Sequence, residues 1–356
     1  MRKYSLRSHA TFAIPKFLLI MISVKSSLRT AIFLSLVLTA SGLSAQCIKG
    51  NCDTGKGVYS YPNGDYYEGE WRSAKRQGVG TYKLANGDVY IGEWKNDEME
   101  GKGVYTYSNG DIYEGMYKKG LMEGFGVYTF SNGSIYTGNW AHNSQNGQGT
   151  WKYPNGTEIT GVWTEGKVNG TAKYFYPNGD YYEGDYIDNK RNGQGKMTTV
   201  EGDVYVGQWA DGQKHGKGSL HYSTGVVYEG EFTQGKMTGM GTLTTPGGSS
   251  YTGNFLNGKY SGQGTLTHAN GDVYTGEWMN GKKHGQGLYV YSDGSRYEGA
   301  WLMDQRHGQG SYVYADGSQY VGEFNSGKVH GKGQLTKPDG SVTKGVFLYG
   351  KFHHEE

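Results

Sequence analysis

A repeat of constant length, 23 residues, runs through most of the chain and limits what it can fold into. Thirteen pentads of the pattern Tyr-x-Gly-x-aromatic follow one another at this spacing without an insertion or deletion, although two copies lack the Tyr. A module this short cannot bury an apolar face alone, so each copy must pack against its neighbours, as in a solenoid. The pentads start at Tyr67, Tyr90, Tyr113, Tyr136, Ile159, Tyr182, Tyr205, Tyr228, Tyr251, Tyr274, Tyr297, Tyr320 and Thr343.

Each repeat shows the alternation of apolar and polar residues that is typical of half-buried β-strands. In the first repeat Tyr67, Gly69 and Trp71 fall on one face of a predicted strand over residues 65–71. A second predicted strand covers residues 80–84. Because both segments recur in every repeat, the sequence predicts about 26 strands and no helix beyond the N-terminal segment.

An Asn-Gly dipeptide precedes several pentads, as at Asn63-Gly64, and Asp replaces the Asn in later copies. Between two alternating segments this dipeptide is the strongest short indication of a hairpin, because both turn residues adopt positive φ. Hairpins that stack side by side form an elongated, single-layer antiparallel ribbon with two open edges. The predicted fold class is therefore all-β, with one signal helix before the ribbon.

Glycine makes up 62 of the 356 residues, about 17%, against a usual share of about 7%. A high glycine content without a period indicates disorder, and glycine at every third position indicates collagen. The 23-residue period fits neither class. Glycine also weakens a helix by about 1 kcal/mol per residue, which disfavours a helix-rich α/β enzyme.

Charge is distributed unevenly along the chain. Residues 1–45 hold six Lys or Arg and no acidic residue, whereas the remainder has 29 basic and 33 acidic side chains. The chain beyond residue 45 therefore carries a net charge of −4 and no overall attraction for a polyanion. We expect no nucleic-acid partner.

The N-terminal segment resembles an export signal. An apolar run over residues 31–38 follows two basic residues and ends in small ones, which is the order found in secretory signal peptides. We assign residues 1–45 to this signal, with Met21 as an alternative start and cleavage between Ala45 and Gln46. A retained membrane anchor is the alternative, but the run is shorter than the roughly 20 residues that an anchor needs. The predicted location is the periplasm, the cell surface or the medium.

The rest of the chain divides into three predicted parts. Residues 46–54 form a short linker, residues 55–350 form the repeat domain, and residues 351–356 form a polar tail. Cys47 and Cys52 lie in the linker, and export favours their oxidation. A local disulfide is therefore one interpretation, and two free thiols are the other.

One copy shows a family resemblance position by position. Tyr274-Thr275-Gly276-Glu277-Trp278, followed by Gly281-Lys282-Lys283-His284-Gly285-Gln286-Gly287, resembles the MORN (membrane occupation and recognition nexus) repeat, whose pattern is Y-x-G-x-W and then G-K-x-x-G-x-G. The resemblance extends over about 300 residues, from Gly55 to Phe347. It implies a meandering antiparallel sheet and roles in scaffolding, self-association and attachment near membranes. Catalytic domains accompany the repeats in some members, but we expect none here and no enzymatic activity.

Several polar residues recur once per repeat and are candidates for a metal or catalytic site. Four histidines recur at one repeat position, but other copies place Gln77 or Ser261 there, so we expect neither a metal site nor a cofactor. Asp65 and its equivalents follow the turn and are expected to be solvated at strand ends. Catalysis needs one distinctive constellation of residues, and identical copies argue against it. The four histidines are His215, His284, His307 and His330.

The aromatic residues of the pentads are the predicted binding surface, because aromatic platforms pack against sugars and peptide side chains. The candidates are Tyr67, Trp71, Tyr90, Trp94, Tyr113, Tyr117, Tyr136, Trp140, Tyr182, Tyr205, Trp209, Tyr274, Trp278, Tyr297 and Trp301.

The sequence thus predicts an exported, non-enzymatic scaffold that binds a protein partner or a second copy of itself. Weak attachment to phospholipid head groups is an alternative, since a column of lysines recurs once per repeat in several copies. Carbohydrate binding or processing is a further alternative.

Overall fold

The computed structural model describes residues 44–355, which form a single antiparallel sheet of 28 strands. The strands are β1 (Gln46–Gly50), β2 (Thr54–Ser60), β3 (Tyr66–Arg72), β4 (Lys75–Lys83), β5 (Val89–Lys95), β6 (Glu98–Thr106), β7 (Ile112–Lys118), β8 (Leu121–Thr129), β9 (Ile135–Ala141), β10 (Ser144–Lys152), β11 (Glu158–Thr164), β12 (Lys167–Phe175), β13 (Tyr181–Ile187), β14 (Lys190–Thr198), β15 (Val204–Ala210), β16 (Gln213–His221), β17 (Val227–Thr233), β18 (Lys236–Thr244), β19 (Ser250–Leu256), β20 (Lys259–Thr267), β21 (Val273–Met279), β22 (Lys282–Val290), β23 (Arg296–Leu302), β24 (Gln305–Val313), β25 (Gln319–Asn325), β26 (Lys328–Thr336), β27 (Val342–Leu348) and β28 (Lys351–Glu355).

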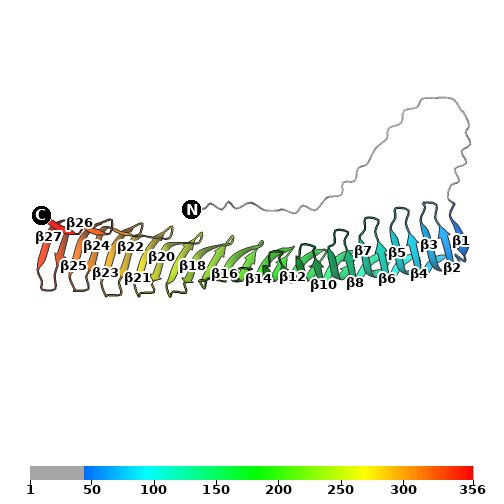
Figure 1. Ribbon diagram of the computed structural model, residues 1–356, viewed down its shortest axis with the longest axis horizontal. Helices are drawn as coiled ribbons and strands as arrows, with labels where there is room; N and C mark the ends of the chain where they lie inside the picture. Colours follow the sequence, from blue (N-terminus) through cyan, green and yellow to red (C-terminus); the bar gives the residue numbers. More distant parts are fainter. Residues whose placement is uncertain (1–43, 356) are drawn as a thin grey trace, which may run out of the picture. The chain divides into compact units, whose positions relative to one another are not determined.

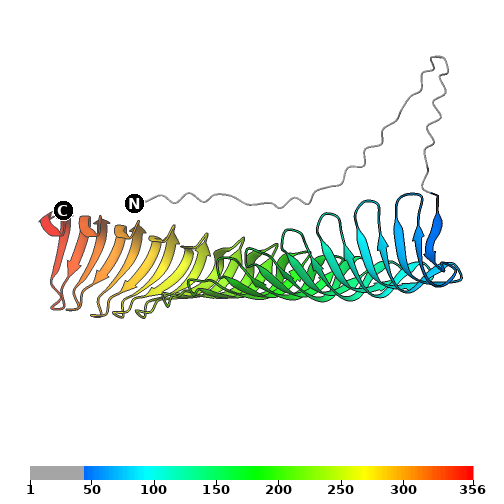
Figure 2. The same cartoon turned by 45° about the vertical axis from the view of Figure 1, so that its right-hand side comes forward.

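Each strand pairs with the strand that follows it in the chain, from β1–β2 to β27–β28. The strands lie side by side in one layer (Figure 1), and the ribbon twists along its length (Figure 2), as right-handed strand twist requires. The predicted all-β fold is confirmed. The described residues contain no helix, and so none that is long and apolar enough to cross a bilayer. The signal helix expected within residues 1–45 lies almost entirely outside the described part of the chain.

The hairpin predicted at Asn63-Gly64 is present between β2 and β3, but the predicted turn type was wrong. At Asn63-Gly64 only Gly64 has positive φ, at 89°. Its N–H donates to the Tyr61 carbonyl at 3.0 Å, and the Tyr61 N–H donates to the Asp65 carbonyl at 2.9 Å, which closes a three-residue loop rather than a two-residue turn. The Asn63 side chain instead accepts a hydrogen bond from the Asp65 N–H at 3.1 Å. Two-residue turns do occur, but at the other end of the hairpin, where both turn residues have positive φ.

The second strand of each repeat is longer than predicted. In the first repeat β4 spans Lys75–Lys83, whereas the prediction was 80–84. A β-bulge explains the difference, because the register of β3 against β4 shifts between Gly69 and Glu70. Gly78 lies in the bulge with φ of 60°, a conformation that favours glycine. The strand therefore begins before Gly78 and Gly80, whereas the predicted strand began only at Gly80.

The core lies on one face of the sheet, called the aromatic face below. The Tyr67 ring lies over the paired glycines Gly69 and Gly80, where any Cβ atom would overlap the ring. Trp71 and, from the next repeat, Trp94 meet this ring edge to face, with centroid distances of 5.1 and 5.5 Å. Similar ring contacts recur along the sheet and make one continuous core.

Most residues of the predicted linker and tail form the first and last strands of the sheet. Residues 46–50 form β1, which pairs with β2, and residues 351–355 form β28, which pairs with β27. Each completes backbone hydrogen bonds for an otherwise open edge. Cys47 and Cys52 are joined by a disulfide that links β1 to the loop before β2.

Candidate binding face

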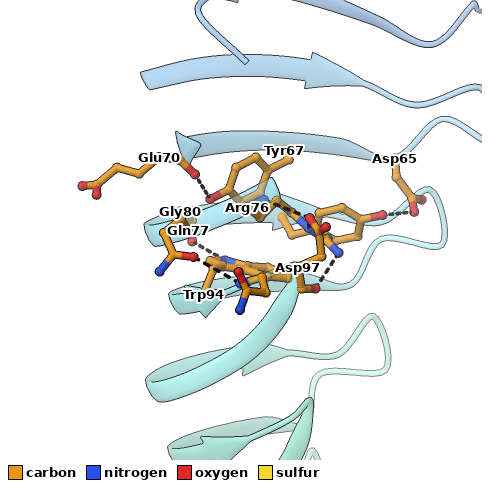
Figure 3. Close-up of polar contacts among 10 residues, drawn as sticks. Asp65, Tyr67, Glu70, Arg76, Gln77, Gly80, Trp94 and Asp97 are labelled. Atoms are coloured by element: carbon orange, nitrogen blue, oxygen red, sulfur yellow. Dashed lines mark hydrogen bonds and ion pairs between the residues drawn. The ribbon is translucent and has the colours of Figure 1, made fainter. Parts of the chain in front are cut away.

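Hydrogen bonds connect neighbouring repeats along the aromatic face (Figure 3). The Trp94 indole N–H donates to the Gly80 carbonyl of the previous repeat at 3.4 Å. The Asp65 carboxylate accepts from the Tyr82 hydroxyl at 2.6 Å and from the Ala85 N–H at 2.9 Å, both in the next repeat. Asp65 therefore joins two repeats, and the expectation that it is merely solvated was wrong.

The pKa values of these aspartates reflect the contacts. Burial alone would raise the pKa of Asp65, but the hydrogen bonds from Tyr82 and Ala85 outweigh it and hold the pKa below its usual range. For Asp272 the hydrogen bonds from the Ser292 N–H and the Tyr289 hydroxyl lower the pKa to about 2. The carboxylates are thus charged in their structural role at neutral pH.

Arginines on the aromatic face add a further contact between repeats. The Arg76 guanidinium carbon lies 4.2 Å from the centroid of the Trp94 ring, within range of a cation–π interaction. The same guanidinium donates to the Asp97 carbonyl at 2.8 Å. Arg191 and Arg306 donate to the equivalent turn carbonyls, both at 2.6 Å. These cations hold the next turn in place.

The structure places the predicted binding residues in the core rather than on an accessible surface. Each is at most 7% exposed, because the tyrosine rings lie flat over glycines and the large rings of the fifth pentad position pack between them. The residues are Tyr67, Trp71, Tyr90, Trp94, Tyr113, Tyr117, Tyr136, Trp140, Tyr182, Tyr205, Trp209, Tyr274, Trp278, Tyr297 and Trp301.

A second set of rings on the same face is accessible instead. It comes from the ends of β6, β8 and β10 and the residues just beyond them, and neighbouring ring centroids lie 4.4 to 5.9 Å apart. All six are partly exposed, Tyr153 the most at 37%. The period of 2 in the sequence predicts three of the six, Tyr105, Tyr128 and Trp151, on the aromatic face. The set, called the aromatic stripe below, is Tyr105, Tyr107, Tyr128, Phe130, Trp151 and Tyr153.

The two-residue turns lie along one long side of the ribbon, which is called the turn edge below. The C-terminal half of this turn edge carries most of its exposed apolar side chains. Exposed apolar side chains stand there between exposed lysines that form no ion pair in the described part of the chain. Nearer the N-terminus, Lys167 and Lys190 are paired with Asp188 and Asp211 at 3.1 and 3.0 Å. Lys95 and Lys118 there are exposed without an ion pair among the described residues, but fewer exposed apolar side chains accompany them. The C-terminal set comprises Leu256, Met279, Leu302, Met303, Leu348 and Tyr349 with Lys236, Lys259, Lys282, Lys328 and Lys351.

The described residues hold no group of three His, Cys, Asp or Glu side chains that could bind a metal ion. The predicted cleavage site, Ala45 and Gln46, lies where the described part of the chain begins, and Met21 lies outside it.

The fold defines a class, a single-layer solenoid of β-hairpins with partly exposed rings along one face. The family model described as the MORN repeat matches thirteen consecutive segments between residues 54 and 342. The chain belongs to the MORN-repeat family, and no other domain is found in it.

No curated protein matches the sequence. Among solved structures, the SAS-4 (dCPAP) TCP domain of Drosophila melanogaster, in complex with a proline-rich motif of Ana2 (dSTIL), is 15% identical with a TM-score of 0.27, over 51% of this chain and 90% of that one. Virginiamycin B lyase of Staphylococcus aureus is 9% identical with a TM-score of 0.13, over 85% and 88%. Scores this low carry no argument about function.

Proposed function

We propose that this protein is an exported scaffold whose aromatic stripe binds a segment of a protein partner. The accessible rings on a rigid sheet carry the proposal. Tyrosine and tryptophan are enriched in protein interfaces because they offer a large contact area at a low entropic cost. The signal-like N-terminus and the disulfide between Cys47 and Cys52 support a location outside the cytoplasm.

Affinity capture from the envelope fraction of the source cells tests this proposal. The wild-type protein is expected to retain a specific partner, and Tyr107→Ser combined with Tyr153→Ser is expected to release it. Phe125→Ser is the matched control, because Phe125 is 58% exposed on the opposite face of β8. Retrieval of no partner, or equal loss in the stripe and control variants, would contradict the proposal.

A second candidate function is attachment to an anionic membrane surface through the C-terminal half of the turn edge. Five lysines and six apolar side chains are exposed along this edge between residues 236 and 351, and among the two-residue turns from residue 234 to residue 350 Asp304 is the one acidic side chain. Lysines contribute about 1 kcal/mol each near an anionic bilayer, and the apolar side chains can enter the head-group layer.

Flotation with vesicles containing phosphatidylserine, at physiological salt, tests this second function. We expect binding that is lost when Lys259, Lys282 and Lys328 are replaced by Gln. Replacement of Lys95 and Lys118, which lie on the same edge nearer the N-terminus, should leave binding unchanged. If the wild-type protein does not float, the membrane function fails and the protein scaffold is unaffected.

A further inference from the structure

The hydrogen bonding between repeats is incomplete at Asp203. One oxygen of Asp203 accepts from the Ser223 N–H at 2.8 Å, as in other repeats. The residue that would supply the tyrosine hydroxyl is Leu220, so the other oxygen has no hydrogen-bond partner among the described residues. At Asp272, by contrast, the second oxygen accepts from the Tyr289 hydroxyl at 2.8 Å.

A cation near Asp203 is unsatisfied as well. Lys214 occupies the repeat position at which Arg191 donates to the Gly212 carbonyl at 2.6 Å. The Lys214 side chain is shorter, and its ammonium lies 5.0 Å from the centroid of the Tyr205 ring. The Lys214 ammonium makes no hydrogen bond and no ion pair within residues 44–355, and burial lowers the pKa of Lys214. A partly buried ammonium without an acceptor is unusual.

Both groups line one cavity of about 300 Å³ on the aromatic face. The cavity exists because smaller side chains replace rings that fill the same positions elsewhere: Met197 and Leu220 stand where most early repeats have Tyr or Trp, and Thr199 stands where they mostly have an aromatic residue. Tyr205, Tyr222 and Phe232 supply aromatic surface, and Thr199 supplies a hydroxyl.

We propose that this cavity binds a sugar residue through two vicinal hydroxyl groups. One hydroxyl donates to the free oxygen of Asp203, and the other accepts from the Lys214 ammonium. Tyr222 packs against the apolar C–H groups of the sugar ring. The site is separate from the proposed scaffold function and does not depend on it.

The mixture of groups favours a sugar over a charged ligand. A hydroxyl both donates and accepts, so a neutral diol satisfies Asp203 and Lys214 without adding charge. The charges of Asp203 and Lys214 oppose each other, and Lys236, the third charged side chain of the lining, is exposed to solvent, where its field is screened. The apolar lining from Met197, Leu220 and Phe232 suits a ligand with one polar and one apolar side, as a pyranose has.

Saturation-transfer NMR on the full chain tests the proposal, with the methyl glycosides of glucose, galactose, mannose and N-acetylglucosamine as probes. At least one probe is expected to bind, with saturation transfer strongest at its C–H protons. Glycine and glutamate serve as zwitterionic probes in the same experiment. If only these amino acids bind, or if nothing binds, the proposal is overturned.

Two variants locate the site. Leu220→Tyr restores the residue that equivalent repeats carry, fills the cavity and supplies the missing hydroxyl to Asp203, so it should abolish sugar binding without loss of fold. Lys214→Met removes the ammonium but keeps a side chain that Met99 and Met237 show at the same repeat position. We expect it to weaken binding about tenfold.

Lys283→Met is the matched control. Lys283 occupies the same repeat position and also lies over aromatic rings, 4.6 Å from Tyr289 and 4.8 Å from Trp301, but it does not line the cavity. It should bind sugar like the wild type. Unchanged binding in Leu220→Tyr or in Lys214→Met overturns the proposal, as does a loss in Lys283→Met that equals the loss in Lys214→Met.

Discussion

The ring of each pentad tyrosine fills the space that two glycines leave open on paired strands, and the fifth repeat shows how closely these residues depend on one another. There Ile159 replaces the tyrosine and Ala172 replaces one glycine. Ala172 pairs with Gly161, and both Ile159 and Ala172 are buried. The methyl group of Ala172 occupies part of the space that a ring takes elsewhere, so a smaller side chain is needed at 159.

A double-mutant cycle tests this dependence. Ile159→Tyr alone should lower stability by about 1–3 kcal/mol, because the ring overlaps the Ala172 methyl group. Ala172→Gly alone leaves a small void and should also destabilise the protein. The double variant recreates the standard arrangement, and a favourable coupling of about 1–2 kcal/mol is expected from urea unfolding. Additive losses would show that the two positions are independent.

The aspartates that join repeats should make stability depend on pH. The pKa values of Asp65, Asp88 and Asp111 are lowered in the folded state, below the value of about 3.9 in an unfolded chain. Their stabilisation is therefore complete above about pH 5 and is lost as the pH falls through the folded-state pKa values. Thermal midpoints measured by circular dichroism from pH 7 to pH 2.5 should fall accordingly. Replacing all three by Asn should lower the midpoint at pH 7 and flatten the curve, whereas parallel curves would contradict the assignment.

At the scale of the strand and turn, the sequence predicts the element type well and the connections poorly. The period of 2 correctly placed Tyr67 and Trp71 on one face of β3. The Asn63-Gly64 dipeptide misled, because an Asn side chain that bonds to the following backbone is equally suited to a three-residue loop. The two-residue turn at Ser73-Ala74 carries no glycine, so composition gave no indication of it.

That turn also provides a test. Ser73 and Ala74 have φ of 51° and 55°, and each non-glycine residue in this region costs about 1–2 kcal/mol. Ala74→Gly should therefore raise the free energy of unfolding by up to about 1 kcal/mol, after the greater flexibility of the unfolded chain is allowed for. Ala85→Gly is the control, since Ala85 does not have positive φ. Equal effects on the urea midpoint would rule out strain at the turn.

At the scale of the molecule, a longer period is superimposed on the repeat. Arg76, Arg191 and Arg306 recur five repeats apart, and each donates to the turn of the next repeat. The pentad rings, which the sequence predicts as the binding surface, are buried for a reason that also lies at this scale. In a uniform repeat the rings that recur in every copy are buried. Distinct sites therefore arise where a copy departs from the pattern, as at Leu220. The pattern alone does not say which departures open a cavity.

The constant length of the repeat matters because every junction between repeats is equivalent. Deleting residues 297–319 joins position 296 to Tyr320 and removes β23 and β24 except for Arg296, which then serves as the first residue of the next strand. The remaining strands keep their alternating direction and their aromatic residues on one face. Since solenoid stability is roughly a sum of nearest-neighbour terms, the shortened protein should fold, with a thermal midpoint within a few degrees of the wild type.

Deleting residues 297–308 alone gives the contrasting case. The cut removes one strand and part of another, so the strands that follow lose both their direction and their register, and the aromatic face is interrupted. Circular dichroism and size-exclusion chromatography should show a folded, slightly smaller protein for the full deletion and a partly unfolded or aggregated one for the half deletion. Equal tolerance of both deletions would mean that distant contacts, rather than contacts between adjacent repeats, stabilise the sheet.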